Sequence, residues 1–267
     1  MLSEANLFCA LAAAIAGLLI GSFLNVCIYR IPRDLSVIRP RSFCPECGKP
    51  VAWYDNIPLL SFSLLKGRCR HCGKSIGVRY PLVELTTALL FGLTVARFGW
   101  NQNGLKWCVF EAIMTVLFWT DLEERLLVDE FTLGGSALGL IFAFFIKVPG
   151  DLGDMLLPSA GVRWQSLFEA FAGAFALTVP LAAIGFIWGR VTKREVLGMG
   201  DVKLLPCIGL FLGLELGIQT LLLGSLLGAF LGGIYIFIMK KKAREYELPL
   251  GSFYCAVAAI TPLFIKF

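Results

Sequence analysis

The sequence contains a single histidine, His71, among its 267 residues. A serine or cysteine hydrolase needs a general base beside its nucleophile, normally a histidine, and many zinc hydrolases use a His-Glu-x-x-His pair. Neither arrangement is present, because no second histidine exists. The chain also lacks the Gly-x-Gly-x-x-Gly pattern of a nucleotide-binding turn. If the chain is hydrolytic, acid/base chemistry by carboxylates is what remains.

Charged residues are scarce as well, at 16% of the chain, whereas 57% of the residues are hydrophobic. This balance excludes an ordinary soluble domain of this length. Most of the long apolar stretches reach the roughly 17 to 25 residues that cross a bilayer, and the stretches 203–215 and 252–267 are short. We therefore predict an all-α polytopic membrane protein with about eight transmembrane helices, near residues 7–28, 81–99, 105–120, 131–148, 166–189, 203–215, 217–239 and 252–267.

The predicted organisation has three parts: a first transmembrane helix over 1–29, a cytosolic zinc-ribbon-like insertion over 30–80, and a seven-helix membrane domain over 81–267. The first helix carries Glu4 where a secretory signal would carry basic residues, and its apolar run is long. We expect this helix to be a retained anchor.

The basic residues predict the orientation, because Lys and Arg of short loops stay on the cytoplasmic side. With the N-terminus outside, the inner segments hold 19 of the 24 basic residues, including ten between Arg30 and Arg79. The outer side keeps five, namely Arg97, Lys106, Lys147, Arg163 and Lys266. Both termini are therefore predicted to lie outside. The net charge of +5 follows from this bias and requires no nucleic-acid partner.

The insertion contains an internal repeat, Cys44-Pro-Glu-Cys47-Gly-Lys and Cys69-Arg-His-Cys72-Gly-Lys. Two Cys-x-x-Cys pairs with a glycine after each, separated by 21 residues, are typical of a four-cysteine zinc site. Two disulfides are the alternative, but the loop is predicted to face the reducing cytosol. Four thiolates leave no open coordination position, so the zinc is expected to be structural. His71 lies inside the second pair and is the alternative ligand.

Two aspartates, Asp121 and Asp201, end or begin apolar segments on the predicted cytosolic side. Two carboxylates that meet share one proton, so one acts as a base and the other as an acid. Gly198 and Gly200 beside Asp201 would allow a substrate backbone to approach closely. Lys203 either biases the pair or marks the inner end of its span.

Other readings of these acids stay open at this point. Asp121 on its own is an ordinary interfacial residue, and Asp201 on its own could cap a helix. Glu84 and Glu111 fall inside predicted spans, where an ionisable group usually has a partner or a task. Composition does not choose the working pair among these candidates.

Several motifs together resemble the bacterial type IV prepilin peptidase family. They occur in the family's order: Gly21-Ser-Phe-Leu-Asn-Val26 with Arg30-Ile-Pro32, the two cysteine pairs, Arg79-Tyr-Pro-Leu-Val-Glu84-Leu85, Asp121 followed by Asp129, and Gly198-Met-Gly-Asp201-Val-Lys203-Leu204. The resemblance implies a bifunctional enzyme of the bacterial inner membrane, with periplasmic termini on the map above. Such an enzyme removes the basic leader from type IV prepilins and type II secretion pseudopilins, cutting after glycine and before phenylalanine. It then methylates the new N-terminus with S-adenosylmethionine.

Carried over by position, the family's catalytic aspartates fall on Asp121 and on Asp201 of the GxGD motif, which presenilin-like proteases share. Val128 stands before Asp129 where the family typically has proline, which leaves the role of Asp129 open. S-adenosylmethionine rests on the resemblance alone, which places methylation in the N-terminal cytosolic region, near the cysteine loop and Glu84. A prepilin has a charged cytosolic leader joined to a membrane helix, so its scissile bond lies at the level predicted for the two aspartates.

Three rival classes can be separated from this one. A transporter should show related halves and helices interrupted at mid-bilayer, and no internal repeat occurs outside the cysteine pairs. A presenilin-like protease of other membrane helices would not need a basic leader. A non-catalytic zinc-ribbon membrane scaffold would tolerate loss of the acid at Asp201.

Overall fold

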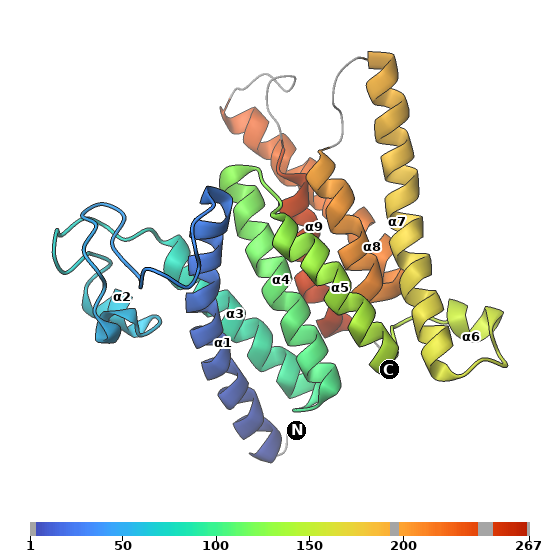
Figure 1. Ribbon diagram of the computed structural model, residues 1–267, viewed down its shortest axis with the longest axis horizontal. Helices are drawn as coiled ribbons and strands as arrows, with labels where there is room; N and C mark the ends of the chain where they lie inside the picture. The colour runs from blue at the N-terminus through green and yellow to red at the C-terminus, as the bar shows by residue number, and fades with distance from the viewer. Residues whose placement is uncertain (1–3, 193–197, 240–247, 266–267) are drawn as a thin grey trace. The chain divides into compact units, whose positions relative to one another are not determined.

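The computed structural model describes residues 4–192, 198–239 and 248–265, and within them every regular element is a helix (Figure 1). The chain divides into two compact units, Met1–Val116 and Leu117–Phe267. The predicted all-α class is confirmed for these residues. The boundary falls inside helix α4 (Gln102–Glu124), so each unit contains part of that helix.

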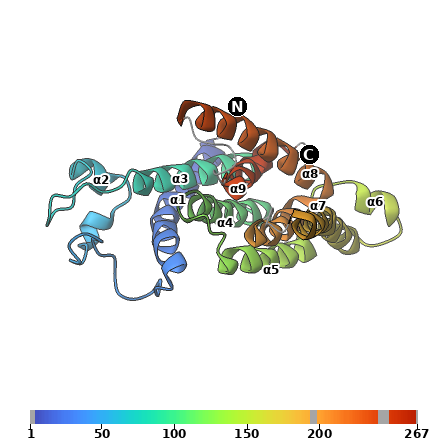
Figure 2. The same ribbon diagram turned by 90° about the horizontal axis from the view of Figure 1, so that it is seen from above.

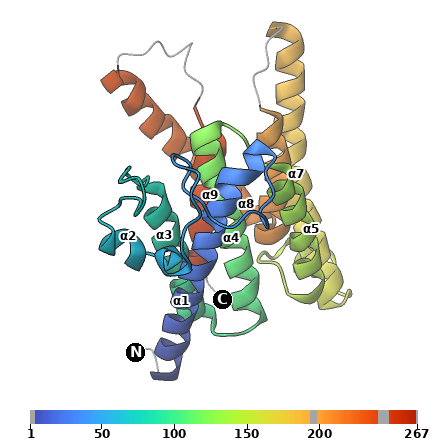
Figure 3. The same cartoon turned by 60° about the vertical axis from the view of Figure 1, so that its left-hand side comes forward.

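The first unit contains two long apolar helices joined by the cysteine-rich insertion. Its elements before α4 are α1 (Glu4–Arg30), η1 (Ile31–Arg33), η2 (Trp53–Asn56), α2 (Leu60–Leu64) and α3 (Arg79–Phe98). Figures 2 and 3 show α2 and its flanking loops at the ends of α1 and α3. The insertion is therefore anchored to both helices, as its place in the sequence predicts.

Helices α1 and α3 pack with their backbones in contact. A methyl group on Gly17 would lie 2.7 Å from Cα of Ala88, and one on Gly21 would lie 2.8 Å from Cα of Glu84. Small residues one turn apart are the usual means of such close approach between membrane helices. The contact brings Asn25, one turn beyond Gly21, against the start of α3.

The second unit contains the end of α4 and the remaining helices. These are α5 (Asp129–Phe145), α6 (Leu152–Leu156), α7 (Val162–Thr192), α8 (Met199–Met239), α9 (Leu250–Ile260) and η3 (Thr261–Phe264). Helices α7 and α8 cross closely, because a methyl group on Gly173 would lie 2.8 Å from the carbonyl oxygen of Gly209. Close packing of α7 and α8 thus accounts for Gly209.

Helix α8 covers two of the predicted spans, 203–215 and 217–239, and non-helical backbone at Gly213 divides it. Gly213 has φ 75°, a left-handed conformation that glycine adopts without steric cost. Glu169, which is buried, accepts hydrogen bonds from the N–H of Leu214 (3.2 Å) and of Gly153 (3.1 Å). The first bond satisfies an N–H group that the break leaves without a helical partner, and the second satisfies an N–H group in the first turn of α6.

Four helical segments are long and apolar enough to cross a bilayer, namely Asn6–Arg33, Arg79–Phe98, Val162–Val191 and Met199–Ile238. Leu250–Phe264 is a shorter apolar segment, and the spans predicted near 105–120 and 131–148 fall on α4 and α5. The chain is therefore an integral membrane protein. Several basic residues used for the predicted orientation lie outside the described residues, namely Lys193, Arg194, Lys240, Lys241, Lys242, Arg244 and Lys266.

Candidate active site and metal centre

Asp121 lies near the end of α4 and is 7% exposed. Its Oδ2 accepts two hydrogen bonds from Ser252, one from the backbone N–H at 2.6 Å and one from Oγ at 2.7 Å. The N–H belongs to the first turn of α9, where amides lack helical partners. Asp121 is therefore held by a helix N-terminus and a hydroxyl, 131 positions away in the sequence.

Asp201 lies in the first turn of α8 and approaches Asp121 across Gly251. A methyl group on Gly251 would lie 3.1 Å from Oδ1 of Asp201 and 3.2 Å from Cγ of Asp121. The two carboxyl groups face the same point of α9, so their separation does not exceed the sum of these two distances. The predicted meeting of Asp121 and Asp201 is present in the structure.

The glycines of the GxGD motif lie where the chain enters α8. A methyl group on Gly200 would lie 3.1 Å from Cβ of Leu127, and one on Gly198 would lie 3.5 Å from Oδ2 of Asp201. Leu127 also lies 2.9 Å from the methyl position of Gly251. The absence of a side chain at Gly200 thus allows Leu127 to pack against Gly200 and Gly251. The absence of a side chain at Gly198 leaves space beside the carboxylate of Asp201.

Lys203 pairs with Asp129 in the structure. Its Nζ lies 2.8 Å from Oδ1 and 2.7 Å from Oδ2 of Asp129, and both side chains are partly exposed. The pair links the second turn of α8 to the first residue of α5. This contact gives Asp129 a defined neighbour next to the site.

Gly251 and Ser252 are part of the site and were not predicted from the sequence. Ser252 was included only as the first residue of a predicted apolar span. The sequence feature that could have pointed to both residues is Pro-Leu-Gly-Ser at the start of that span, which begins at Pro249. Small and polar residues at the N-terminus of an apolar helix are candidates for packing and capping roles.

The arrangement of Asp121 and Asp201 supports acid/base chemistry. Two carboxyl groups at this separation can both reach one water molecule, because a hydrogen bond spans about 2.7 Å. Two carboxyl groups that share one proton provide a base and an acid at the same place. One member can then accept a proton while the other donates one.

The two cysteine pairs fold into matching knuckles. In the first, the N–H of Gly48 donates to the carbonyl of Cys44 (2.8 Å), and in the second the N–H of Gly73 donates to that of Cys69 (2.9 Å). Both glycines have positive φ, 68° and 70°. Glycine is favoured at this conformation, which turns the chain so that both cysteines of a pair face the same way.

The four cysteine sulfurs, of Cys44, Cys47, Cys69 and Cys72, lie within 4.8 Å of one another. Tetrahedral zinc with Zn–S bonds of about 2.3 Å separates its sulfurs by roughly 3.8 Å, and Cys44 Sγ lies 3.9 Å from Cys72 Sγ. The residues therefore fit a zinc ion. All nine cysteines are free in the described residues, which argues against the disulfide alternative, and His71 is outside the cluster.

Glu84 and Glu111, the acids predicted inside spans, are buried in the first unit. Oε2 of Glu84 accepts a hydrogen bond from the N–H of Leu59 (2.9 Å), a residue with φ 57°. Glu111 accepts one from Thr94. Each buried acid thus has a partner, as the cost of an isolated charge requires.

A helical membrane protein in which two aspartates converge beside the ends of their helices, and which carries a four-cysteine knuckle pair, belongs to the class of membrane-embedded aspartyl peptidases. Residues 15–98 match the family described as "Bacterial Peptidase A24 N-terminal domain", and residues 108–233 match the "Type IV leader peptidase family". The chain belongs to the type IV leader peptidase family. No solved structure matches it.

Several relatives bear the name "Prepilin leader peptidase/N-methyltransferase". The protein of Neisseria gonorrhoeae is 34% identical over 80% of this chain and 77% of its own length. The protein of Xanthomonas campestris is 33% identical over 92% of this chain and 88% of its own length. The protein of Myxococcus xanthus is 39% identical over 74% of this chain, and the match spans only 54% of that longer protein.

Proposed function

We propose that this chain is an aspartyl endopeptidase of the bacterial inner membrane that removes the basic leader from type IV prepilins and type II secretion pseudopilins, and then N-methylates the new N-terminus. Relatives named for both activities support the proposal. The observation that carries the peptidase half is the convergence of Asp121 and Asp201 on Gly251.

In the proposed reaction, the ionised member of the pair takes a proton from water as the water attacks the scissile carbonyl. The protonated member donates its proton to the developing oxyanion. Collapse of the tetrahedral intermediate breaks the C–N bond, and the departing amine receives a proton from the pair. The reaction consumes one water and restores the shared proton. Ser252 keeps Asp121 in place through its two hydrogen bonds.

The positions of the aspartates suit a substrate cut at the membrane boundary. Asp121 lies in the last turn of α4, which ends at Glu124, and Asp201 lies in the first turn of α8, which begins at Met199. A prepilin has a soluble basic leader joined to an apolar helix, so its scissile bond occupies the same level. With both termini periplasmic, this level is the cytosolic face.

Zinc at the four cysteines is proposed to be structural, since four thiolates fill a tetrahedral site. The methylation half requires S-adenosylmethionine, whose sulfonium supplies a methyl group to the amine while the S–C bonding electrons stay on sulfur. The amine loses a proton to solvent in this substitution. No electron acceptor is needed, and the zinc takes no part in the exchange.

The test is cleavage of a purified prepilin by the parent chain and by Asp121→Asn and Asp201→Asn. Each substitution keeps the shape of the side chain and removes the acid. We expect each to lower cleavage by at least about 10³-fold, in line with the loss of an essential acid or base. Asp154→Asn is the matched control, because Asp154 pairs with Lys147 and is not at the site. Cleavage by either site variant at the control's rate would refute the assignment.

A second arm tests the substrate class. A membrane helix without a basic leader and without glycine before the cut should remain intact. Efficient cleavage of such a helix would favour a presenilin-like protease of broader specificity. A protein that cleaves neither substrate, yet retains zinc, would favour the scaffold.

A further inference from the structure

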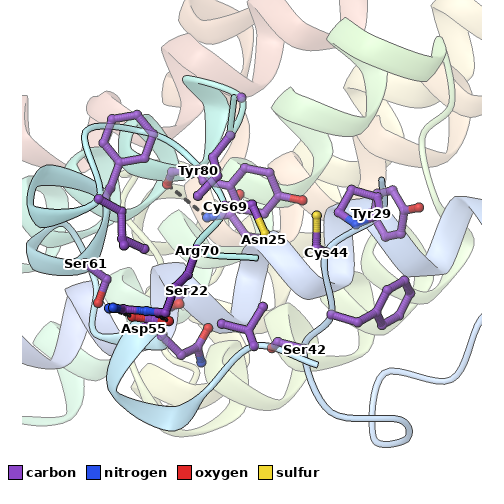
Figure 4. A pocket seen from close by; sticks show the side chains of 18 of the residues that line it. Ser22, Asn25, Tyr29, Ser42, Cys44, Asp55, Ser61, Cys69, Arg70 and Tyr80 are labelled. Atoms are coloured by element: carbon purple, nitrogen blue, oxygen red, sulfur yellow. Dashed lines mark hydrogen bonds and ion pairs between the residues drawn. The ribbon is translucent and has the colours of Figure 1, made fainter. Parts of the chain in front are cut away.

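A cavity of about 380 Å³ lies in the first unit, beside the cysteine-rich loop (Figure 4). Neither aspartate of the acid pair lines it, so this cavity does not hold the scissile bond. The peptide at that bond meets instead the surroundings of the acids, where Gly198, Gly200 and Gly251 provide no side chains. Among the contacts of these three glycines, Leu127 is the apolar side chain that approaches the acids.

Leu127 reaches the point at which the two acids converge. The methyl position of Gly251 lies 2.9 Å from Cδ1 of Leu127, 3.1 Å from Oδ1 of Asp201 and 3.2 Å from Cγ of Asp121. Cδ1 of Leu127 is therefore within about 6 Å of both carboxyl groups, since it cannot lie farther from either than the two distances combined. Leu127 is 6% exposed, so close packing fixes the place of this methyl group.

The turn that carries Leu127 is attached to both helices that bear the acids. The N–H of Arg125 donates to the carbonyl of Asp121 (3.1 Å), which ties the start of the turn to the end of α4. The carboxylate of Asp129 accepts hydrogen bonds of 2.7 and 2.8 Å from Nζ of Lys203, which ties the end of the turn to α8. These contacts hold Leu127 beside the acid pair.

The substrate residue that supplies the scissile carbonyl must come close to the same place. A water molecule held by both carboxyl groups attacks that carbonyl carbon from about 3 to 3.5 Å. The side chain of the same residue begins two bonds away, about 2.5 Å from the carbonyl carbon. Carbon atoms in contact prefer a separation of about 3.5 to 4.0 Å. A side chain that points toward the turn therefore meets the δ-methyl group of Leu127, whereas glycine has no side chain to place.

We propose that Leu127 is the residue that restricts the position before the cut to glycine. The inference rests on the proposed peptidase function and deepens it, because it names the side chain that limits the substrate. A methyl group at that position of the substrate would have to displace Leu127. The packing of Leu127 against Gly200 and the two attachments of its turn oppose that displacement. A shorter side chain in place of Leu127 should therefore admit alanine before the cut.

The experiment compares a prepilin that has glycine before the cut with the same prepilin carrying alanine there. The parent chain, Leu127→Ala and Leu127→Val are assayed for kcat/KM on both substrates, and the alanine-to-glycine ratio of these values is the measured quantity. We expect Leu127→Ala to raise this ratio at least about tenfold over the parent's, because one methylene group in an apolar pocket changes discrimination by about 10- to 200-fold. Leu127→Val, which keeps more of the side chain, should give an intermediate ratio.

Leu126→Ala is the matched control, because Leu126 is the neighbouring leucine of the same turn and is 44% exposed. This variant should keep the parent's ratio. A third prepilin, with leucine in place of phenylalanine after the cut, tests which side of the bond Leu127 faces. Its kcat/KM relative to that of the natural prepilin should be the same for the parent and for the Leu127 variants. A change confined to this third substrate would overturn the assignment to the position before the cut.

Misfolding lowers kcat/KM for both substrates alike, so the ratio reports on specificity. An unchanged ratio in both Leu127 variants would overturn the inference, and so would an equal rise in Leu126→Ala. Loss of all cleavage in both Leu127 variants would also overturn it, since Leu127 would then be required for the reaction with glycine itself. A parent chain that cleaves the glycine prepilin while the ratios stay constant leaves the proposed function standing. A parent chain that cleaves no prepilin refutes the proposed peptidase function.

Discussion

Replacing Gly251 with alanine should damage catalysis while preserving the fold. The added methyl group would lie 2.9 Å from Cδ1 of Leu127, 3.1 Å from Oδ1 of Asp201 and 3.2 Å from Cγ of Asp121. Carbon atoms in contact prefer about 3.5 to 4.0 Å, so both carboxyl groups must retreat by a few tenths of an ångström. A misplacement of 1 Å can cost about 10²-fold in rate. We therefore expect kcat to fall by about three- to tenfold or more.

The assay is steady-state cleavage of a prepilin, with kcat and KM measured separately. KM should change little, because the methyl group contacts the acid pair and Leu127. Overpacking costs about 1 to 3 kcal/mol, so the thermal transition should fall by only a few degrees. Gly233→Ala is the matched control, since a methyl group there meets no atom within 4 Å. A Gly251→Ala protein with the control's kcat would refute the view that this glycine sets the geometry of the acids.

Ser252→Ala should lower kcat by about tenfold, because the hydroxyl's hydrogen bond to Asp121 is lost while the backbone N–H remains a donor. Ser252→Thr keeps a hydroxyl and should retain most of the activity. Metal analysis should find about one zinc per chain, and Cys47→Ser should lower this content and expose the loop to proteases. Arg70 lowers the pKa of Asp55 through a two-point hydrogen bond, so Arg70→Met should destabilise the loop near pH 7. The difference should begin to shrink as the pH falls below about 4 and should be lost below the lowered pKa of Asp55. Glu169→Gln should lower stability by about 1 to 3 kcal/mol, since one amide oxygen cannot accept both the N–H of Leu214 at the break in α8 and the N–H of Gly153 in α6.

Ser225→Ala is the control for Ser252→Ala, because Ser225 contacts Tyr254 of α9 away from the acids. An equal decrease of kcat in both variants would show that Ser252 does not act through Asp121. A loop that resists protease after metal removal would contradict a structural zinc. A stability difference for Arg70→Met that does not shrink as the pH falls from about 5 to about 2 would exclude the ion pair as its cause. Glu215→Gln, an exposed change on α8, should leave the unfolding temperature within a degree or two of the parent's.

The parts predicted well from sequence are those encoded by local repeats or by helix boundaries. The knuckles could be predicted because each glycine and cysteine pair acts within six residues, and the paired hydrogen bonds repeat in both halves. Asp121 and Asp201 could be placed at one level because each lies next to the end of an apolar helix. Their selection over Glu84 and Glu111 needed the family resemblance.

The parts that could not be predicted depend on contacts between distant segments. Ser252 forms a hydrogen bond with Asp121, 131 positions away in the sequence, and no local sequence pattern predicts that contact. The pairing of Lys203 with Asp129 spans 74 positions and was likewise missed. The sequence predicted two spans, 203–215 and 217–239, where the structure has one helix with a break at Gly213. The sequence did not show that Glu169, from α7, accepts the hydrogen bond of the N–H of Leu214 at this break.

Helix α9 follows both aspartates in the sequence, so it is synthesised after them. Both acids are translated before the glycine that separates them and the serine that holds one of them. A partly synthesised chain therefore has its two aspartates in the bilayer without the contacts that align them. On the proposed function, the two aspartates are aligned for cleavage only after α9 has inserted beside them.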